Sequence, residues 1–360
     1  MMRAVYSTVE KVARATDVNA TAYQTEQILD ALQSASRDVD ALVSLGDEQR
    51  PAFAPWSGTI AFDWPTHDSR DAYRVWLDEF RLHSFTAVTS GGVDVLASAL
   101  GWPASGPPYH ALEIDTASAS ALEIGAGTGQ RSLSITGVWG TLGEDRARAS
   151  WTLGASVSAS ADEWVINAPV GIGSLVLAGA ERVIVSARAF ADSGQTASAL
   201  TASMADQAIT VADGSAFLAG ETIAIDGERM IVRGVVGNVL TVTRAADGST
   251  LASHAGAAPV LWERACTVER AQLGTSASAH TSASALSIYR PPPLAEQLAI
   301  AYAIDRRAQE DVGYARSLSH IMDRGGLSAK RAGGDVGAIG IRALEERVIA
   351  AYGRIRLRSI

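Results

Sequence analysis

One short sequence pattern occurs twice in this chain of 360 residues, and the spacing of its copies restricts the fold more than any other feature. Segment 267–280 repeats segment 241–254 at an offset of 26, with a Thr-Val-x-Arg-Ala run, a Gly and a His at matching places. Segment 220–232 repeats segment 173–185 at an offset of 47, with a Gly and a Glu-Arg-x-Ile-Val run. A tandem array would show a single offset. Two offsets indicate a nested duplication, in which an inner β-unit at about 205–264 is inserted between the two halves of its sibling.

The repeats themselves have the pattern of antiparallel strands. Apolar residues alternate with other residues through the inner unit, as in half-buried strands. The pairs Asp226-Gly227 and Gly237-Asn238 are typical of tight hairpin turns. The single cysteine, Cys266, lies in an alternating run, which predicts a strand interior, and it has no partner for an intrachain disulfide.

Helical patterns flank the β-rich middle. Apolar residues at 28, 32, 35, 39 and 42 are spaced by 4, 3, 4 and 3, which predicts a helix from about 22 to 45. Pro291-Pro292-Pro293 ends the strand pattern, and its last proline can begin a helix. A final helix carries Ile341, Leu344 and Val348. These patterns predict an α+β fold, with a helical core formed by the N- and C-terminal segments and a long antiparallel-β middle that contains the nested units.

Four regions follow from these boundaries. Residues 1–50 form the N-terminal helical part of the core, and 51–140 form a β-rich region. Residues 141–290 form the duplicated β insertion, and 291–360 supply the C-terminal helices and a basic tail that complete the core. Aromatic residues concentrate between 53 and 80, where they are core residues by default and an interface as the alternative.

The charge distribution separates an acidic body from a basic end. Residues 290–360 contain 12 Arg and Lys against 8 Asp and Glu, a balance of +4, so the net charge of -9 leaves -13 on residues 1–289. An acidic body argues against general nucleic-acid binding, which needs a basic surface. No apolar run approaches the length of a membrane span, and the N-terminal sequence lacks a signal-peptide core. We therefore expect a protein made in the cytoplasm, with neither a membrane nor a specific nucleic acid as a partner.

The repeated polar residues leave two interpretations open. His254 and His280 occupy equivalent positions. They could form a paired ligand or sugar contact, or they could be turn residues that bond a backbone carbonyl. Glu181 and Glu228 are also equivalent. They could form a glycosidase-type pair of carboxylates, or they could be turn carboxylates beside the arginines that follow them. None of the six histidines has the spacing of a metal motif, and the glycine run 125–129 lacks the strand and helix of a phosphate-binding loop. We expect no catalytic residue, no cofactor and no metal.

The C-terminal segment is the candidate binding site. Basic and apolar residues alternate in it, which indicates an edge strand able to add to a partner's sheet; the alternative is a solvated tail. Arginine can pair with carboxylates bidentately, so an acidic partner surface would match. The candidate contact residues are Arg354, Ile355, Arg356, Leu357 and Arg358.

A family resemblance covers residues 22–140 and 290–360. The helix-forming start, Pro107-Pro108-Tyr109, Leu112-Glu113-Ile114-Asp115 and the strand 135–140 (Ile-Thr-Gly-Val-Trp-Gly) resemble the head-tail connector, or adaptor, proteins of tailed bacteriophages. In that family a strand ending in a Gly-aromatic-Gly step closes the β portion; here the step is one residue longer. The resemblance implies a ring of this chain, commonly a dodecamer, beneath the portal protein, with the C-terminal segment reaching into the portal and no enzymatic activity.

The expected function is therefore that of a structural virion protein. It would join the capsid to the tail in the virion neck, after assembly in the host cytoplasm, and its partners would be itself, the portal and the next neck or tail-completion protein. One alternative is a tail or baseplate protein with carbohydrate-binding β modules. The other is a carbohydrate-active enzyme that uses Glu181 and Glu228.

Overall fold

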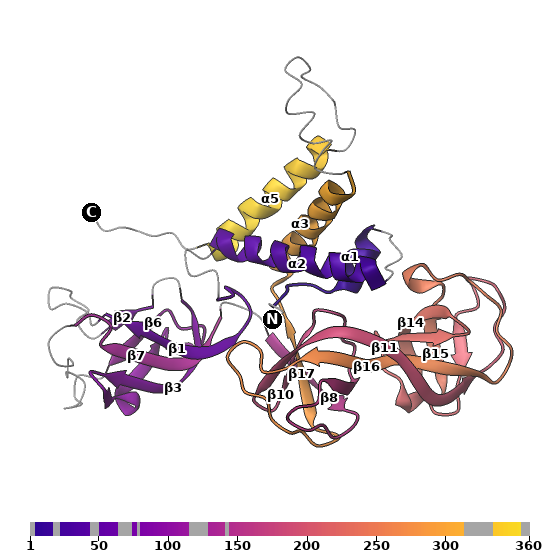
Figure 1. Cartoon of the computed structure of the whole chain (residues 1–360), viewed down its shortest axis with the longest axis horizontal. Helices are drawn as coiled ribbons and strands as arrows, with labels where there is room; N and C mark the ends of the chain where they lie inside the picture. The colour runs from indigo at the N-terminus through magenta and orange to yellow at the C-terminus, as the bar shows by residue number, and fades with distance from the viewer. Residues whose placement is uncertain are drawn as a thin grey trace, which may run out of the picture.

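The computed structural model describes residues 4–16, 22–43, 50–63, 74–77, 80–114, 129–140, 144–312 and 334–353. Three antiparallel β-sheets dominate this part of the chain, and four α-helices lie to one side of them (Figure 1). The helices are α1 (Val9–Thr16), α2 (Ala22–Val43), α3 (Pro293–Val312) and α5 (Gly334–Tyr352). None of the helices in the described residues is both long and apolar enough to span a lipid bilayer.

The first β-region contains two small sheets. One has the order β1-β7-β3-β4 and the other the order β2-β6-β5. Alternate residues of β7 are buried, and Trp139 stacks on Trp56 with ring centroids 5.9 Å apart. Phe53, Trp56 and Phe62 are buried as well, so these members of the aromatic cluster are core residues. The strands are β1 (Trp56–Phe62), β2 (Arg74–Trp76), β3 (Leu82–Ser90), β4 (Val93–Asp94), β5 (Ala99–Trp102), β6 (Ala111–Ile114) and β7 (Leu133–Trp139).

The ten remaining strands form one large sheet with the order β11-β10-β17-β8-β9-β16-β13-β14-β15-β12. Because β11 also pairs with β16, the first six of these strands close on themselves and form the outer unit. Strands β13, β14, β15 and β12 continue from β16 and form the inner unit. The strands are β8 (Glu144–Leu153), β9 (Glu163–Asn167), β10 (Leu175–Ala178), β11 (Glu181–Ala197), β12 (Ala208–Thr210), β13 (Thr222–Ile225), β14 (Glu228–Val236), β15 (Val239–Thr243), β16 (Ala258–Glu269) and β17 (Ala285–Arg290).

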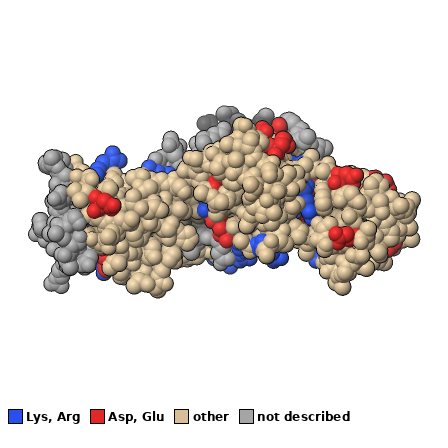
Figure 2. Space-filling view, turned by 90° about the horizontal axis from the view of Figure 1, so that it is seen from below, with Lys and Arg blue, Asp and Glu red and all other residues tan. Residues whose placement is uncertain are grey.

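Strands β11 and β16 connect the two units as a long ribbon. They pair from Ile184↔Glu269 at the outer unit to Ala197↔Ala258 at the inner unit. The ribbon runs from the middle of the molecule to the lobe at the right of Figure 1. The first β-region, the outer unit and the inner unit thus follow one another along the long axis, and Figure 2 shows the same elongated outline from below.

Matching strand registers reproduce the two sequence offsets. The β10–β11 pair Val176↔Val183 corresponds to the β13–β14 pair Ile223↔Met230, and all four residues shift by 47. The register shift between Val185 and Ala187 on β11 recurs between Val232 and Gly234 on β14, also 47 residues on. The outer pair β11–β16 therefore has the same register as the inner hairpin β14–β15. The inner unit is attached at the end of the β11–β16 pair that lies farthest from the outer unit.

The domain boundaries stated above stay predictions.

One close contact joins the first β-region to the outer unit. Ser57 N donates to Leu273 O at 2.8 Å, and a Cβ at Gly274 would lie 1.9 Å from Ser57 O. Gly274 also has a φ of +78°, which side chains other than glycine rarely adopt. This position therefore requires glycine.

The expected α+β fold with a helical core from the two chain ends is wrong. The chain is mostly β, with 41% strand and 24% helix. Three of the five apolar clusters lie in the β-regions, and the helices contribute to the other two, in which alanines such as Ala295 and Ala299 lie beside larger residues such as Leu32 and Leu298. The helices pack on one another and on Leu175, Ile184 and Tyr289 of the large sheet. They form a layer beside the sheets, and most of the buried apolar residues lie on the strands and their loops.

Candidate functional site

The inner unit contains a buried cluster of Glu228, Arg244 and His254. Arg244 donates to Glu228 through Nε to Oε1 and through Nη2 to Oε2, each at 2.8 Å. His254 Nε2 lies 2.9 Å from Glu228 Oε2. The backbone N–H groups of Ala245 and Ala252 donate to the two carboxylate oxygens at 2.9 and 3.0 Å. Four groups therefore make five polar contacts with one carboxylate.

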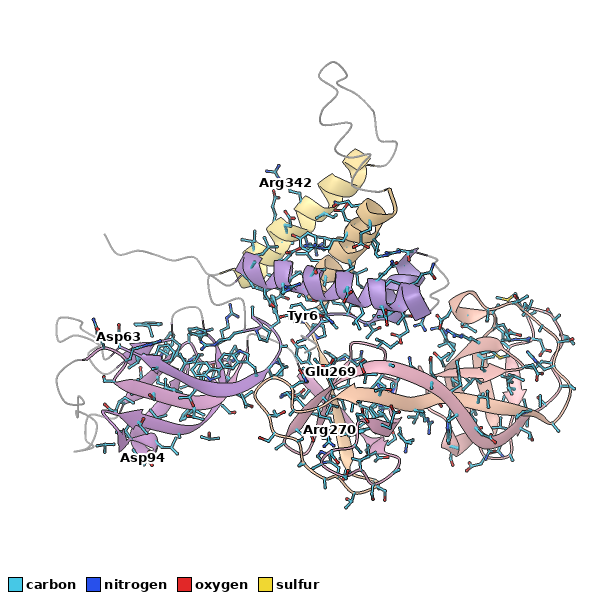
Figure 3. The ribbon with its side chains drawn as sticks, in the orientation of Figure 1. Tyr6, Asp63, Asp94, Glu269, Arg270 and Arg342 are labelled. Atoms are coloured by element: carbon cyan, nitrogen blue, oxygen red, sulfur yellow. The ribbon has the colours of Figure 1, made fainter. Side chains whose placement is uncertain are left out.

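The outer unit contains the same cluster, built from the equivalent residues. Arg270 donates to Glu181 through Nε to Oε1 at 2.9 Å and through Nη2 to Oε2 at 2.7 Å. His280 Nε2 lies 2.8 Å from Glu181 Oε2. The N–H groups of Ala271 and Ser278 donate at 3.2 and 3.1 Å. Atom for atom, the five contacts match those of Glu228, and Figure 3 shows Arg270 inside the central β-region.

Both arginines also hold the loops that enclose the cluster. Arg244 donates to the carbonyls of Thr201, Asp206 and Ala252. Arg270 donates in the same way to the carbonyls of Ser158, Ala161 and Ser278. Each guanidinium therefore connects a strand end, a carboxylate and two loops, which is the role of a structural cross-link.

Burial and charge keep both carboxylates ionised. The side chains of Glu181 and Glu228 are completely buried. Burial alone would raise the pKa of each, but hydrogen bonds from the arginine, the histidine and the two backbone N–H groups outweigh burial and lower each pKa to about 2. A carboxylate held in this state has no free lone pair for a substrate and cannot act as a general acid near neutral pH.

The contacts match neither interpretation of the repeated polar residues in full. The histidine rings bond a carboxylate, and neither a shared ligand nor a backbone carbonyl is their partner. The glutamates form no pair with each other and bind Arg244 and Arg270, not the arginines that follow them in sequence. Of those adjacent arginines, Arg182 binds Asp145 bidentately at 3.0 and 2.9 Å, and the guanidinium of Arg229 lies 5.5 Å from the ring centroid of Phe190. The sequence offsets did identify the matched residues, but not which of them touch.

The two clusters differ at the second histidine nitrogen. His254 Nδ1 lies 3.0 Å from the carboxylate of Asp226, in the turn between β13 and β14. The position equivalent to Asp226, 47 residues earlier, is Gly179, which has no side chain to offer His280. His280 instead contacts the edge of Trp164, with ring centroids 5.4 Å apart. The inner cluster therefore carries one more charged group than the outer cluster.

Two polar contacts elsewhere were missed by sequence reasoning. Glu221 binds Arg264 at 2.8 and 3.0 Å in a buried pair. Asp40 on α2 accepts hydrogen bonds from Tyr6 OH and from Ala52 N. The repeats point to neither contact. The position of the outer unit equivalent to Glu221 is Ser174, and Tyr6 lies outside the repeats.

The C-terminal candidate residues Arg354, Ile355, Arg356, Leu357 and Arg358 lie outside the described residues. The structure does describe the point from which they start. Tyr352, near the end of α5, packs edge-on against the buried Phe53 with ring centroids 5.4 Å apart, and Arg81 donates to Tyr352 O at 3.2 Å. The start of the basic segment is therefore attached both to the first β-region and to the helical layer.

The positions of the described side chains support neither a metal site nor a reactive cysteine. Within the described ranges, no three His, Cys, Asp or Glu side chains are grouped so as to hold a metal ion. Cys266 is buried in β16, as its alternating pattern predicted, and burial raises the pKa of its thiol to about 12. The thiol is therefore an apolar core group.

Comparison with known proteins gives no relative. No family model matches the chain, and neither the curated proteins nor the solved structures contain a significant match.

Proposed function

We propose that this chain is a structural subunit of a phage neck, a head-tail connector that forms a ring below the portal and docks on it with residues 354–360. The proposal continues the resemblance stated above and involves no catalysis. The observation that carries it is the attachment of Tyr352, because a docking arm needs a fixed origin.

The origin of the arm is held by three contacts of different kinds. The ring of Tyr352 packs on Phe53, its carbonyl accepts from Arg81, and Gly353 N donates to Ile349 O at 2.8 Å. Restricting the first residue of an arm reduces the conformational entropy lost when the arm binds. In a ring, the same small interface would be repeated in every copy, so weak contacts would add to a stable joint.

Charge supports the same assignment. Arg354, Arg356 and Arg358 follow directly on the attached end of α5, while residues 1–289 carry a balance of -13. A positively charged arm is attracted to an acidic partner surface, and its arginines can bind carboxylates bidentately. An acidic strand edge on the portal is the expected partner surface.

The test uses the full chain and the isolated portal. Gln substitution of Arg354, Arg356 and Arg358 would remove three ion pairs with the portal, worth roughly 0.5–1 kcal/mol each, which corresponds to about 10- to 150-fold weaker binding. Negative-stain images of the unmodified chain, alone and with the portal, should show rings and portal-bound rings. Binding is measured by co-sedimentation with the portal.

A matched control keeps the result specific. Arg342 and Arg347 are exposed arginines on α5, and Figure 3 shows Arg342 on the outward side of that helix. Their double Gln variant should bind the portal normally. Unchanged binding of the triple variant, equal loss in the control, or a monomer with no affinity for the portal would each refute the proposal.

The carbohydrate-binding alternative gains no specific observation. Sugar-binding modules present exposed aromatic faces, but the large exposed apolar side chains described between 144 and 312 are Val165, Met204, Val236 and Val239. Trp262 is half-buried, with the guanidinium of Arg264 at 4.0 Å from its ring centroid and Phe217 edge-on at 6.0 Å. The glycosidase alternative gains no support either, because Glu181 and Glu228 are enclosed in separate, saturated clusters.

A further inference from the structure

A cavity of about 590 Å³ lies where helix α1, the outer unit and the inner unit meet. Its walls come from residues 8–14 around the start of α1, from β8, from the end of β17, and from the equivalent loops 169–174 and 219–222. At the offset of 47, loop 169–174 corresponds to 216–221, so the two copies contribute overlapping parts of the same loop to one cavity.

The side chains around the cavity are strongly basic. One carboxylate, that of Glu10, lines it. Six cationic side chains line it: Lys11, Arg14, Arg146, Arg148, Arg188 and Arg290. Figure 2, which views the molecule from below, shows Lys and Arg atoms along one edge of the central lobe and in the notch beside the right-hand lobe.

Three of the cations are neutralised by nearby carboxylates. Lys11 binds Glu296, and Arg14 binds Asp247 at 2.8 Å. Arg188 binds two carboxylates, those of Glu10 at 2.9 Å and Glu263 at 2.8 Å. Each carboxylate in these ion pairs therefore already has a basic partner.

Arg148 and Arg290 are left without an ion pair to any described carboxylate. Arg148 is exposed, and its guanidinium lies over the face of Trp151, 5.4 Å from the ring centroid. Arg290 is half-buried; burial lowers its pKa, Glu296 opposes this, and the charges of Arg146 and Arg148 add to the lowering. The positive charges that face the cavity repel one another. An anion bound among them would be attracted to each of them and would offset this repulsion.

The hydrogen-bond donors of the cavity wall are also incompletely used. Arg188 is almost fully buried, and its Nε is the one buried side-chain nitrogen or oxygen in the described residues without a hydrogen-bond partner. Buried donors in proteins are nearly always paired with protein, water or ligand. Arg146 and Arg148 are alternate residues of β8, so they project to the same face of that strand, next to the end of β17. Guanidinium groups in such an array match the oxygens of phosphates and carboxylates.

We propose that this cavity is an oxyanion-binding site in which Arg148 and Arg290 bind a phosphate or carboxylate group. The site does not depend on the neck function, because its charge and shape come from one chain. Two sources of the oxyanion are chemically equivalent here, a free phosphate compound and an acidic side chain of a second copy of this chain.

Calorimetric titration with inorganic pyrophosphate and with citrate tests the site, with potassium chloride keeping the ionic strength constant. The unmodified chain should bind saturably at submillimolar concentration. Arg148→Gln and Arg290→Gln should each weaken binding at least tenfold. Arg342→Gln, which removes an 80% exposed charge on α5, should leave binding unchanged. Arg148 is exposed, so its variant is expected to fold even if the Arg290 variant does not, and circular dichroism checks both.

A second measurement separates the two sources. If a neighbouring copy supplies the carboxylate, pyrophosphate should lower the molar mass measured by light scattering; if the ligand is free, the mass should not change. The proposal is overturned if neither probe binds saturably below ~10 mM, a limit of roughly 3 kcal/mol in affinity. It is equally overturned if Arg148→Gln binds as well as the unmodified chain, or if Arg342→Gln loses as much affinity.

Discussion

Replacing Arg244 by methionine tests whether the repeated clusters are structural cross-links. Met retains much of the apolar stem but removes the guanidinium, and with it two bonds to Glu228 and three to loop carbonyls. Glu228 would then be a buried carboxylate without its counterion, held only by His254 and two backbone N–H groups. Removing one partner of a buried pair typically costs about 3–5 kcal/mol, and we expect about 4 kcal/mol here because both side chains are completely buried.

Urea unfolding followed by tryptophan fluorescence measures this loss. With a denaturant dependence of about 2–3 kcal/mol per molar urea, a loss of about 4 kcal/mol lowers the midpoint by roughly 1.5 M. Arg270→Met should cost about the same amount, because Glu181 has the same five contacts. Arg342→Met changes an exposed i,i+4 pair and should cost under about 0.5 kcal/mol.

A double variant separates the unpaired charge from the lost packing. Glu228→Gln introduced into Arg244→Met leaves a neutral group of the same shape, so the double variant should be more stable than Arg244→Met alone by about 1–2 kcal/mol. The reasoning is refuted if Arg244→Met loses less than about 1 kcal/mol, within the range of ordinary surface substitutions. A double variant less stable than the single one would refute it as well.

Three further predictions concern titration and reactivity. Because the pKa values of Glu181 and Glu228 are lowered from 4.5 to about 2, their stabilisation is complete above pH 4.5 and is lost as the pH falls toward 2. Urea midpoints of Glu228→Gln should therefore fall less steeply over that range than those of the unmodified chain, and parallel curves would contradict this. Burial raises the pKa of Asp40 from 3.8 to about 7, against hydrogen bonds from Tyr6 and Ala52, so the stability it contributes is complete below pH 3.8 and is lost as the pH rises through 7. Asp40→Asn should gain stability relative to the unmodified chain between pH 5 and pH 8, and a constant difference across that range would count against the assignment. Cys266 should resist a disulfide reagent in the folded chain and release one equivalent of product in urea, whereas fast reaction of the folded protein would show that the thiol is accessible.

Features encoded by neighbouring residues were predictable from the sequence. The helix expected from about 22 to 45 is α2, and the helix expected to begin at the last of three prolines is α3. Hairpin turns at Asp226-Gly227 and at Gly237-Asn238 are confirmed, because residues able to adopt positive φ mark such turns locally. Burial of Cys266 is confirmed for a similar reason, since alternation along one strand reports which face is inside.

The partners of charged residues depended on strand register and loop path, which a local pattern does not specify. Glu228 is adjacent in sequence to Arg229, yet its carboxylate binds Arg244, 16 residues away across a hairpin. Likewise, the helical periodicities were detected correctly, but their spacing says nothing about how large a core they fill. Most of the buried apolar residues in the described part of the chain lie outside the helices.

The linear order of residues was enough to recognise two nested copies of one unit, because equivalent residues keep their spacing through duplication. It was also enough to locate several helices and turns, because these follow from the conformational preferences of neighbouring residues. The folded chain was needed to find that the helices form a layer on a mostly β protein and that the Glu, Arg and His of each repeat meet around one buried charge. The tertiary structure alone also gathered arginines from α1, β8, β11 and β17 around one cavity. These contacts join residues far apart in the chain, and their geometry exists only once the strands have paired.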